Sequence, residues 1–399
     1  MREVCDALRM LIADLVAAVE HIAPSRYAES WDNTGLILGD RARPIDGPVL
    51  LAIDFSPAVC EEAVKLRASA IIAYHPPIFS PIRRLTGESP RGAALLRAAA
   101  SSIAVYSPHT ALDAAPGGIA DWLLDCALHD APPATVSRTD PKNPQRRALV
   151  PHGSSDPART HKLVTFVPAE PPGLIEAIRE ALAKAGAGRI GEYDSCSFNV
   201  RGTGTFRGSE KSNPALGERG RLESVEELRL EMVCPARALP DVIAALRRAH
   251  PYEEPAFDVY RLEPAPEAAV GAGRIGTLGA PCDLKSLAAR IRRNLGVGAV
   301  QVADAGGARD AISRVAVCPG SGSALLAASA DAGAQVFITG EMKHHDVLEA
   351  LDRGVSVILA GHTETERGYL PHLGAALGAR LPGARWIVSA ADRAPLATI

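Results

Sequence analysis

Short apolar runs alternate with helical patterns along the first third of the chain. Apolar, often β-branched stretches predict strands at Val49–Asp54, at Ala70–His75 and from Ile103 to His109. Between them, apolar residues at helical spacing predict helices at Pro57–Ala68 and Gly92–Ala100. Continuously apolar strands that alternate with helices are typical of a parallel sheet covered on both faces. The pattern therefore predicts a βαβαβ unit.

The last third of the chain repeats this pattern. Strands are predicted at Arg314–Cys318, at Gln335–Thr339 and from Val355 to Gly361, with helices at Gly322–Ala332 and Asp346–Arg353 between them. Any two βαβαβ units resemble each other, so the pattern alone is weak evidence for an internal duplication. Both units, however, carry the sequence His-Thr-x-x-acid after their third strand, which favours duplication.

The middle of the chain follows a different pattern. Segments 129–161 and 263–273 contain several prolines and show no periodicity, which predicts two linkers. Between them, residues 162–262 predict strand, helix, strand, strand, helix and strand, which is the ferredoxin-like βαββαβ order. An insertion at this point implies that residues 1–140 and 270–399 fold together as one discontinuous α/β domain with a mostly parallel sheet.

Composition excludes several classes of protein. Of the 399 residues, 47% are hydrophobic and 22% are charged, and the net charge of -3 gives no basic field for nucleic acid. The seven cysteines include no Cys-x-x-Cys pair, which argues against a disulfide framework and favours a reducing cytoplasm. No apolar run reaches the roughly 18 residues that a spanning helix needs. The pattern of Val4–Ile22 predicts an amphipathic helix rather than a cleaved signal peptide.

Ligand-type side chains follow the predicted strands. His109 and Asp113 follow the third strand of the first unit, and His362 and Glu366 follow the third strand of the second. His75 ends another strand, where two prolines hold the chain extended. Ligand sites of open α/β sheets lie at the carboxyl ends of strands, so we expect these residues at one edge of a single sheet. Imidazole nitrogens and carboxylate oxygens together suit Zn, Mn or Fe.

The same residues also have structural interpretations. His362 and Glu366 could form a surface pair on the first turn of a helix, and Asp113 could cap a turn. Glu341 is either a pocket wall or an acidic residue favoured at a helix N-terminus. Three strand ends that each carry a ligand-type residue nevertheless favour a metal site.

A polar cluster near the N-terminus has a simpler interpretation. Trp31–Gly35 precedes the apolar Leu36–Leu38, as a turn does when it enters a strand. Turn residues are chosen for backbone reasons, so we interpret the cluster as a capped turn with a buried tryptophan.

Five stretches of the chain, taken in order, closely resemble the Nif-three-like family, whose members are also named type-two homologues of GTP cyclohydrolase type I. They are SWDNTGLILGD, IIAYHPPIF, SPHTALDAAPGG, FITGEMKHHD and GHTETERG. The resemblance implies a discontinuous α/β domain that holds a dinuclear centre of two divalent metal ions. It also implies an inserted domain similar to the nitrogen-regulatory and copper-tolerance signal proteins, and a toroidal homohexamer.

The resemblance further implies a set of metal ligands. Matched to the family motifs, they are His75, Asp113, His362 and Glu366. The chain departs from the family at Tyr74, where many members carry the first histidine of a His-His-Pro motif. A neutral phenol is a poor ligand, so we expect one of the two metals to be held weakly. Pocket or ligand-supporting roles are expected for Tyr74, His109 and Glu341.

Two functions are compatible with these features. The first is a metal-dependent hydrolase that acts on a nucleotide or a related small molecule, for which a reaction like that of GTP cyclohydrolase type I is one option. The second is a non-catalytic metal-handling or regulatory scaffold protein, because no acid/base dyad is recognisable beyond the ligands. In both cases we expect a small-molecule partner and a cytoplasmic homo-oligomer, with no membrane or direct nucleic-acid partner.

Overall fold

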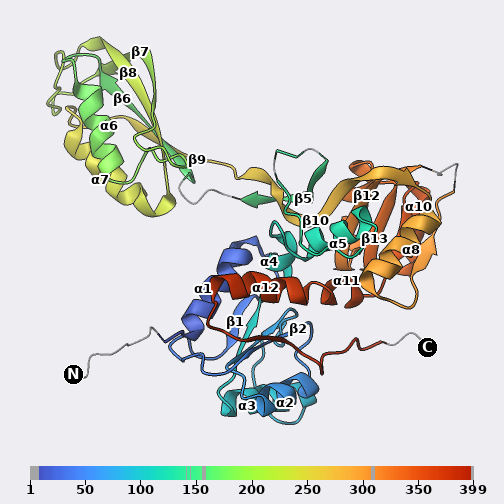
Figure 1. Ribbon diagram of the computed structural model, residues 1–399. Coiled ribbons are helices and arrows are strands. Elements are labelled where there is room, and N and C mark those ends of the chain that lie inside the picture. The colour runs from blue at the N-terminus through green and yellow to red at the C-terminus, as the bar shows by residue number, and fades with distance from the viewer. Residues whose placement is uncertain (1–8, 141, 144, 155–158, 307–310, 397–399) are drawn as a thin grey trace, which may run out of the picture. The chain divides into compact units, whose positions relative to one another are not determined.

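The chain folds into two compact units (Figure 1). The computed structural model describes residues 9–140, 142–143, 145–154, 159–306 and 311–396. The outer unit consists of Met1–His152 and Glu267–Ile399, and the inserted unit consists of Gly153–Pro266. Each unit has a hydrophobic core of its own. Among the described residues, no helix combines the length and the apolar character needed to span a bilayer.

The first sheet of the outer unit has five strands in the order β1-β4-β3-β2-β15. They are β1 (Gly35–Leu38), β2 (Val49–Ala52), β3 (Ala70–Ala73), β4 (Ala104–Ser107) and β15 (Trp386–Val388). Neighbouring strands are parallel, except that β1 is antiparallel to β4. Leu50 packs toward α2 (Pro57–Lys65) and α3 (Pro90–Ala100), whereas Leu51 enters the main core. Burial on both faces explains why β2, β3 and β4 are continuously apolar.

The second sheet of the outer unit has six strands in the order β11-β14-β13-β12-β10-β5. They are β5 (Arg146–Ser154), β10 (Ala265–Cys282), β11 (Gln301–Ala303), β12 (Ile312–Ser321), β13 (Val336–Glu341) and β14 (Ser356–Leu359). The strands β12, β13 and β14 are parallel, whereas β10 is antiparallel to β12 and β11 to β14. The predicted alternation of strands and helices is present in both halves of the unit.

The expectation of a single sheet for the two halves is wrong. The side of β2 that could join the other half is paired with β15, and the corresponding side of β12 is paired with β10. The strands of each βαβαβ half therefore belong to a separate sheet. The main core contains side chains from both sheets, such as Leu51 and Ile338.

Strands also occupy parts of the segments that were expected to be linkers. β5 lies within 129–161, and β10 begins within 263–273. Both strands contain proline and glycine, which obscure the local pattern. Their hydrogen-bond partners come from a sheet formed elsewhere in the chain, so local periodicity does not reveal them.

Helices of the outer unit complete the core. Besides α2 and α3 they are α1 (Ile12–Ile22), α4 (His109–Ala114), α5 (Ile119–Leu128), α8 (Leu284–Leu295), α9 (Leu326–Asp331), α10 (His344–Asp352), α11 (Glu364–Arg367) and α12 (Leu370–Arg380), with short 3-10 turns at Ser25–Tyr27 and Ser323–Leu325. The sequence predicts that the first helix begins at Val4, which lies outside the described residues. Helix α1 begins only at Ile12, where Asp14 Oδ2 accepts the backbone N–H of Leu11 at 2.7 Å.

The inserted unit contains a four-stranded antiparallel sheet in the order β7-β8-β6-β9. Its elements are β6 (His161–Pro168), α6 (Leu174–Lys184), β7 (Phe198–Arg207), β8 (Leu222–Cys234), α7 (Leu239–Ala249) and β9 (Phe257–Arg261), with a 3-10 turn at Ala236–Ala238. Ile178 of α6 and Leu246 of α7 are buried against strand residues such as Leu230. The order of strands and helices agrees with the pattern predicted for residues 162–262.

Candidate metal centre

Strand ends from both sheets meet inside the outer unit. His75 follows β3 of the first sheet, whereas His362 follows β14 of the second and Glu366 lies on α11. The ligand-type atoms of these three side chains all lie within 4.8 Å of one another, and we call them the metal triad. His75 Nε2 is 3.6 Å from Glu366 Oε2, and His362 Nε2 is 3.5 Å from Glu366 Oε1. Three of the four ligands implied by the sequence therefore converge.

A carboxylate lies behind each histidine of the triad. His75 Nδ1 is hydrogen-bonded to Asp54 Oδ1 at 3.0 Å, and His362 Nδ1 lies 3.0 Å from Glu341 Oε1. A carboxylate that holds Nδ1 orients the ring and leaves Nε2 free to bind a metal, as is usual for metal-ligating histidines. The pocket residue Glu341 expected from the sequence is thus in contact with a candidate ligand. The sequence did not mark Asp54 as a functional residue, although it lies just beyond Ile53, after the end of β2.

The residues of the triad fit a divalent metal ion. The side chain of Glu366 is only 2% exposed, and its Oε2 has no hydrogen-bond partner among the described residues. A buried carboxylate oxygen without a partner is costly unless a cation or another donor satisfies it. A Cβ at Gly320 would come within 2.6 Å of Glu366 Oε1 and 3.0 Å of His362 Nε2, so glycine keeps this space open. Two imidazoles and one carboxylate suit Zn, Mn or Fe.

The fourth implied ligand, Asp113, is engaged by Tyr74. Tyr74 Oη donates a hydrogen bond to Asp113 Oδ1 at 2.8 Å. Burial, and then the nearby carboxylates, raise the pKa of Tyr74, so it remains a neutral donor at neutral pH. Burial also raises the pKa of Asp113 to about 7. Asp113 does not belong to the closely spaced triad, and its carboxylate accepts a hydrogen bond from the phenol instead.

His109 is held beside the triad by a buried carboxylate. Its Nδ1 is 2.7 Å from Asp32 Oδ1, and Asp32 also accepts hydrogen bonds from the backbone N–H and hydroxyl of Thr110. Although burial opposes it, these hydrogen bonds lower the pKa of Asp32. The ring of His109 is centred 5.4 Å from those of His75 and Tyr74. Its backbone has a φ of +31°, a strained conformation that the surrounding contacts maintain.

The interpretation of Trp31–Gly35 as a turn with a buried tryptophan is wrong in one respect. The turn leads into β1, but the side chain of Trp31 is 58% exposed. Its ring contacts only Phe79 and His109 among the described aromatic rings. The side chain that is buried instead is Asp32, because its carboxylate satisfies His109 and Thr110. Polar partners far along the chain could not be inferred from the local pattern.

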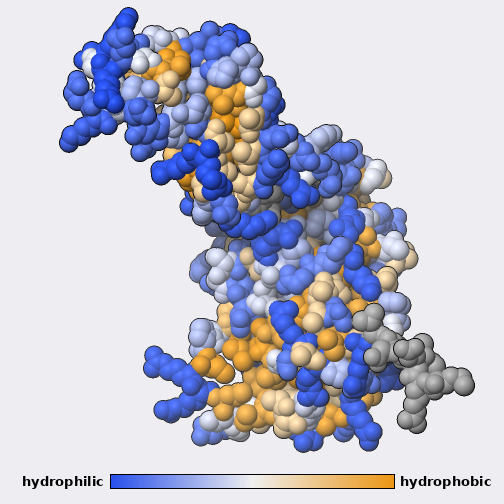
Figure 2. Space-filling model, turned by 90° about the vertical axis from the view of Figure 1, so that its left-hand side faces the viewer, coloured by the Kyte–Doolittle hydropathy of each residue, from blue (hydrophilic) through white to orange (hydrophobic). Residues whose placement is uncertain are grey.

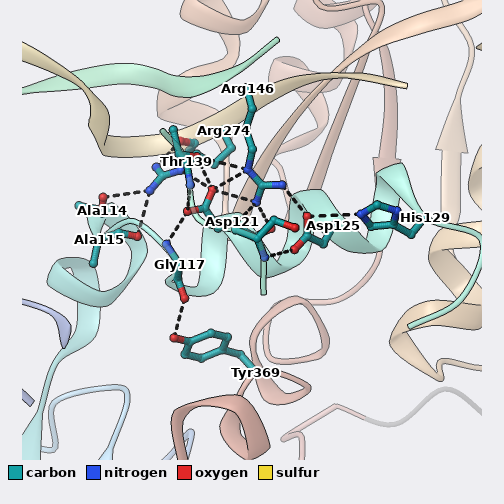
Figure 3. Close-up of polar contacts among 12 residues, drawn as sticks. Ala114, Ala115, Gly117, Asp121, Asp125, His129, Thr139, Arg146, Arg274 and Tyr369 are labelled. Carbon is teal, nitrogen blue, oxygen red and sulfur yellow. Dashed lines mark hydrogen bonds and ion pairs between the residues drawn. The ribbon is translucent and has the colours of Figure 1, made fainter. Parts of the chain in front are cut away.

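A buried ion network supports the backbone that follows Asp113 (Figure 3). Arg274 of β10 donates to the carbonyl oxygens of Ala114 and Ala115 at 3.0 Å each, and to Asp121 Oδ1 at 2.9 Å. Asp121 of α5 also accepts from the N–H of Gly117 at 2.6 Å and pairs with Arg146 of β5 at 3.0 Å. The side chains of Arg274 and Asp121 are fully buried. The network thus joins α5, β5 and β10 to the segment that carries Asp113.

The charge state of His75 depends on its two carboxylate neighbours. Burial works against protonation, but the hydrogen bond to Asp54 and the negative charge of Glu366, whose Oε2 lies 3.6 Å from Nε2, outweigh it and raise the pKa of His75 to about 10. Without a cation in the triad, a proton on His75 therefore balances these carboxylates at neutral pH. A metal ion that binds through Nε2 must displace that proton.

Comparisons with known proteins point to one family. The model of the family described as Duf34/NIF3 (NGG1p interacting factor 3) matches residues 10–395. A Mycobacterium tuberculosis protein named GTP cyclohydrolase 1 type 2 homolog is 38% identical over 335 residues, which cover 84% of this chain and 82% of the relative. The Bacillus subtilis protein of the same name is 36% identical over 348 residues, covering 87% of each chain. A bovine NIF3-like protein 1 is 31% identical over 388 residues, covering 96% of this chain and 92% of the relative.

Solved structures agree with the fold over nearly the whole chain. A Bacillus cereus protein related to NIF3 superposes with a TM-score of 0.65 at 30% identity, covering 97% of this chain and 98% of that one. A Staphylococcus aureus protein superposes with a TM-score of 0.76 at 24% identity, covering 98% and 99%. The second likeness concerns the fold alone.

Proposed function

The chain belongs to the Duf34/NIF3 family, and from this premise we propose that it is a metal-dependent hydrolase acting on a nucleotide or a related small molecule. One observation carries the proposal: two imidazoles oriented by carboxylates converge on a buried carboxylate whose Oε2 accepts no hydrogen bond from the described residues. Curated relatives are named GTP cyclohydrolase 1 type 2 homolog, which makes a purine nucleotide a reasonable first candidate.

The residues of the site would have two different roles in hydrolysis, metal binding and proton transfer. His75, His362 and Glu366 would hold a divalent metal, which supplies Lewis acidity and brings the pKa of water toward neutrality. The Asp32 carboxylate only accepts hydrogen bonds, so it favours a proton on Nδ1 of His109, and in the neutral imidazole Nε2 is then an acceptor. His109 Nε2 would then take the proton from an attacking water. The Asp32–His109 pair supplies the acid/base dyad that was not recognisable in the sequence.

A second divalent ion completes the proposed centre. Asp113 would ligate it. His109 lies four residues before Asp113 on α4 and is near enough along the helix to support the same position. The hydrogen bond from Tyr74 competes for the same carboxylate, so this second position is the weaker one. We propose Zn, Mn or Fe for both positions on the basis of the mixed nitrogen and oxygen ligands.

Features outside the site belong to the same proposal. The strand order β7-β8-β6-β9 with two helices on one face supports a ferredoxin-like inserted domain. Apolar residues gather on one face of the outer unit, at the level of the first sheet and its helices, which supports self-association, and the family resemblance makes a homohexamer the proposed assembly (Figure 2). Free thiols support a cytoplasmic location: Cys60, Cys126, Cys196, Cys234, Cys282 and Cys318.

Turnover of a nucleotide panel by metal-loaded protein tests the proposal. His362→Ala and Glu366→Gln should each lower turnover by more than about 100-fold and reduce the metal content, because both remove a ligand. His21→Ala is the matched control, because His21 is exposed at the end of α1. Unchanged turnover in both ligand variants would refute the site. Tight metal binding without any turnover would favour the scaffold protein instead.

A further inference from the structure

Two exposed aromatic rings stand beside the candidate centre. Trp31 is 58% exposed and Phe79 is 50% exposed. Their ring centroids are 5.8 Å apart, and each lies 6.2 Å from the ring of His109. We call Trp31 and Phe79 the aromatic pair. Water around exposed aromatic rings is unfavourable, so a ligand that covers these two rings beside the candidate metal site would gain free energy from their burial.

Polar contacts of the neighbouring residues hold the backbone that carries the aromatic pair. Asp32, next to Trp31, is tied to His109 and Thr110 through its buried carboxylate. Asn33 Nδ2 donates to the carbonyl oxygen of Ile78, next to Phe79, at 2.5 Å. The loop of Trp31 and the loop of Phe79 are therefore tied to each other and to α4. A backbone that is fixed before binding loses little conformational entropy when a ligand stacks on the rings it carries.

A row of rings connects the aromatic pair to the metal triad. The ring of His109 is centred 5.4 Å from that of His75, which is centred 5.4 Å from that of His362. His75 and His362 keep 23% and 36% of their side chains exposed, so the triad is open to solvent. A small ligand on the aromatic pair would leave its other end free to reach the triad, whereas a protein surface there would cover the approach to His109.

We propose that Trp31 and Phe79 form the surface on which the planar heterocycle of a nucleotide-class substrate stacks, with its hydrolysable group directed toward the triad. The aromatic faces are electron-rich and attract flat nitrogen heterocycles, and such stacking tolerates different bases. The proposal rests on the proposed function for the choice of substrate class. Stacking itself requires no turnover, so it can be measured separately.

Binding of three probes to metal-free and zinc-loaded protein tests the stacking. Guanosine and adenosine 5′-monophosphate should bind both forms, and ribose 5-phosphate, which lacks the base, should bind at least about tenfold more weakly. Trp31→Ala and Phe79→Ala should each weaken nucleotide binding by about tenfold while ribose 5-phosphate binding and metal content stay unchanged. Trp31→Phe, which keeps a ring, should retain most of the affinity.

Phe198→Ala is the matched control, because this ring is 62% exposed but belongs to the inserted unit. Equal affinity for nucleotides and ribose 5-phosphate, absence of nucleotide binding, or unaltered nucleotide affinity in both alanine variants would overturn the proposal. A changed oligomeric mass of Trp31→Ala with unaltered nucleotide affinity would assign the pair to a contact between copies. Nucleotide binding that depends on Trp31 without turnover would refute the proposed function but leave the stacking in place.

Discussion

At the scale of single residues, three histidines of the outer unit share one arrangement. Nδ1 of each lies within 3.0 Å of a carboxylate oxygen, and the partners are Asp54 for His75, Asp32 for His109 and Glu341 for His362. Such a partner fixes the ring and raises the basicity of the other nitrogen. The histidines are therefore oriented before any metal binds. Tyr74, where the chain departs from the family motif, has its ring next to those of His75 and His109.

Replacing Tyr74 should change the second metal position. In the unmodified protein we expect one tightly held metal and a second that binds only in excess, because Tyr74 engages Asp113 as a neutral donor. Tyr74→His should tighten the second step by about tenfold or more, since it adds an imidazole and frees the carboxylate. Calorimetric titration of metal-free protein measures both steps.

Tyr74→Phe is the matched control, because it frees Asp113 without adding a ligand. A second step that tightens equally in Tyr74→Phe would assign the effect to the lost hydrogen bond alone. Two equally tight sites in the unmodified protein would contradict the asymmetry.

The first metal should bind more tightly as the pH rises. The pKa of His75 is raised from 6.5 to about 10 in the metal-free fold, so its proton stabilises that fold fully below pH 6.5. This stabilisation is lost as the pH rises through about 10, and a metal must displace the same proton. We therefore expect metal binding at pH 8 to release about one proton from His75.

Calorimetry in buffers of different ionisation enthalpy measures the protons released. Asp54→Asn weakens the largest of the contributions that raise the pKa of His75, the hydrogen bond to Asp54, so it should lower the release at pH 8. Metal binding at pH 8 without proton release would contradict this account of His75.

At the scale of elements, the connection between α4 and α5 depends on buried charge. Asp121 on α5 faces Arg146 of β5 and Arg274 of β10, and Arg274 also holds the carbonyls after Asp113 (Figure 3). The pairing with the two arginines outweighs burial and lowers the pKa of Asp121. Segments separated by more than a hundred residues along the chain thus fix one candidate ligand.

Removing one partner of this network should destabilise the protein strongly. Arg274→Met removes one of the two positive charges that balance the buried carboxylate of Asp121, so it should lower the free energy of unfolding by about 3–5 kcal/mol. It should also weaken the second metal step, because the carbonyls of Ala114 and Ala115 lose their donor. Denaturant unfolding and metal titration measure the two effects.

Asp46→Asn is the control for an exposed pair, since Asp46 and Arg9 keep most of their side chains in solvent. It should change the unfolding free energy by less than about 1 kcal/mol. If Arg274→Met were no more destabilising than Asp46→Asn, the network would not support the site.

At the scale of the whole molecule, the inserted unit should be dispensable for the metal triad. All three triad residues lie in the outer unit, and the inserted unit has a separate core. Replacing Gly153–Pro266 by a short Gly/Ser linker keeps Arg146 and Arg274 and should give a soluble protein that binds the first metal. Elemental analysis and circular dichroism measure this outcome.

Gly153–Pro266 produced alone is the complementary test and should fold without metal. An insoluble outer unit, or one that has lost its metal, would show that the two units depend on each other. In that event the domain boundaries proposed from the sequence would be wrong.

The sequence by itself determined most of the elements and the ligand types. Apolar runs and helical spacing located the strands and helices of both halves and of the insert, and the family motifs selected His75, His362 and Glu366, which the structure brings together as a candidate site. Local pattern suffices there because burial on one or two faces imposes a period on consecutive residues.

Tertiary structure alone decided how those elements combine. It separated the two halves into two sheets, placed strands β5 and β10 in the expected linkers, and exposed Trp31. It also joined Asp32 to His109 across the chain and Tyr74 to Asp113. Each of these outcomes depends on partners far apart in sequence, whose approach is set by the packing of the whole unit and leaves no local period to detect.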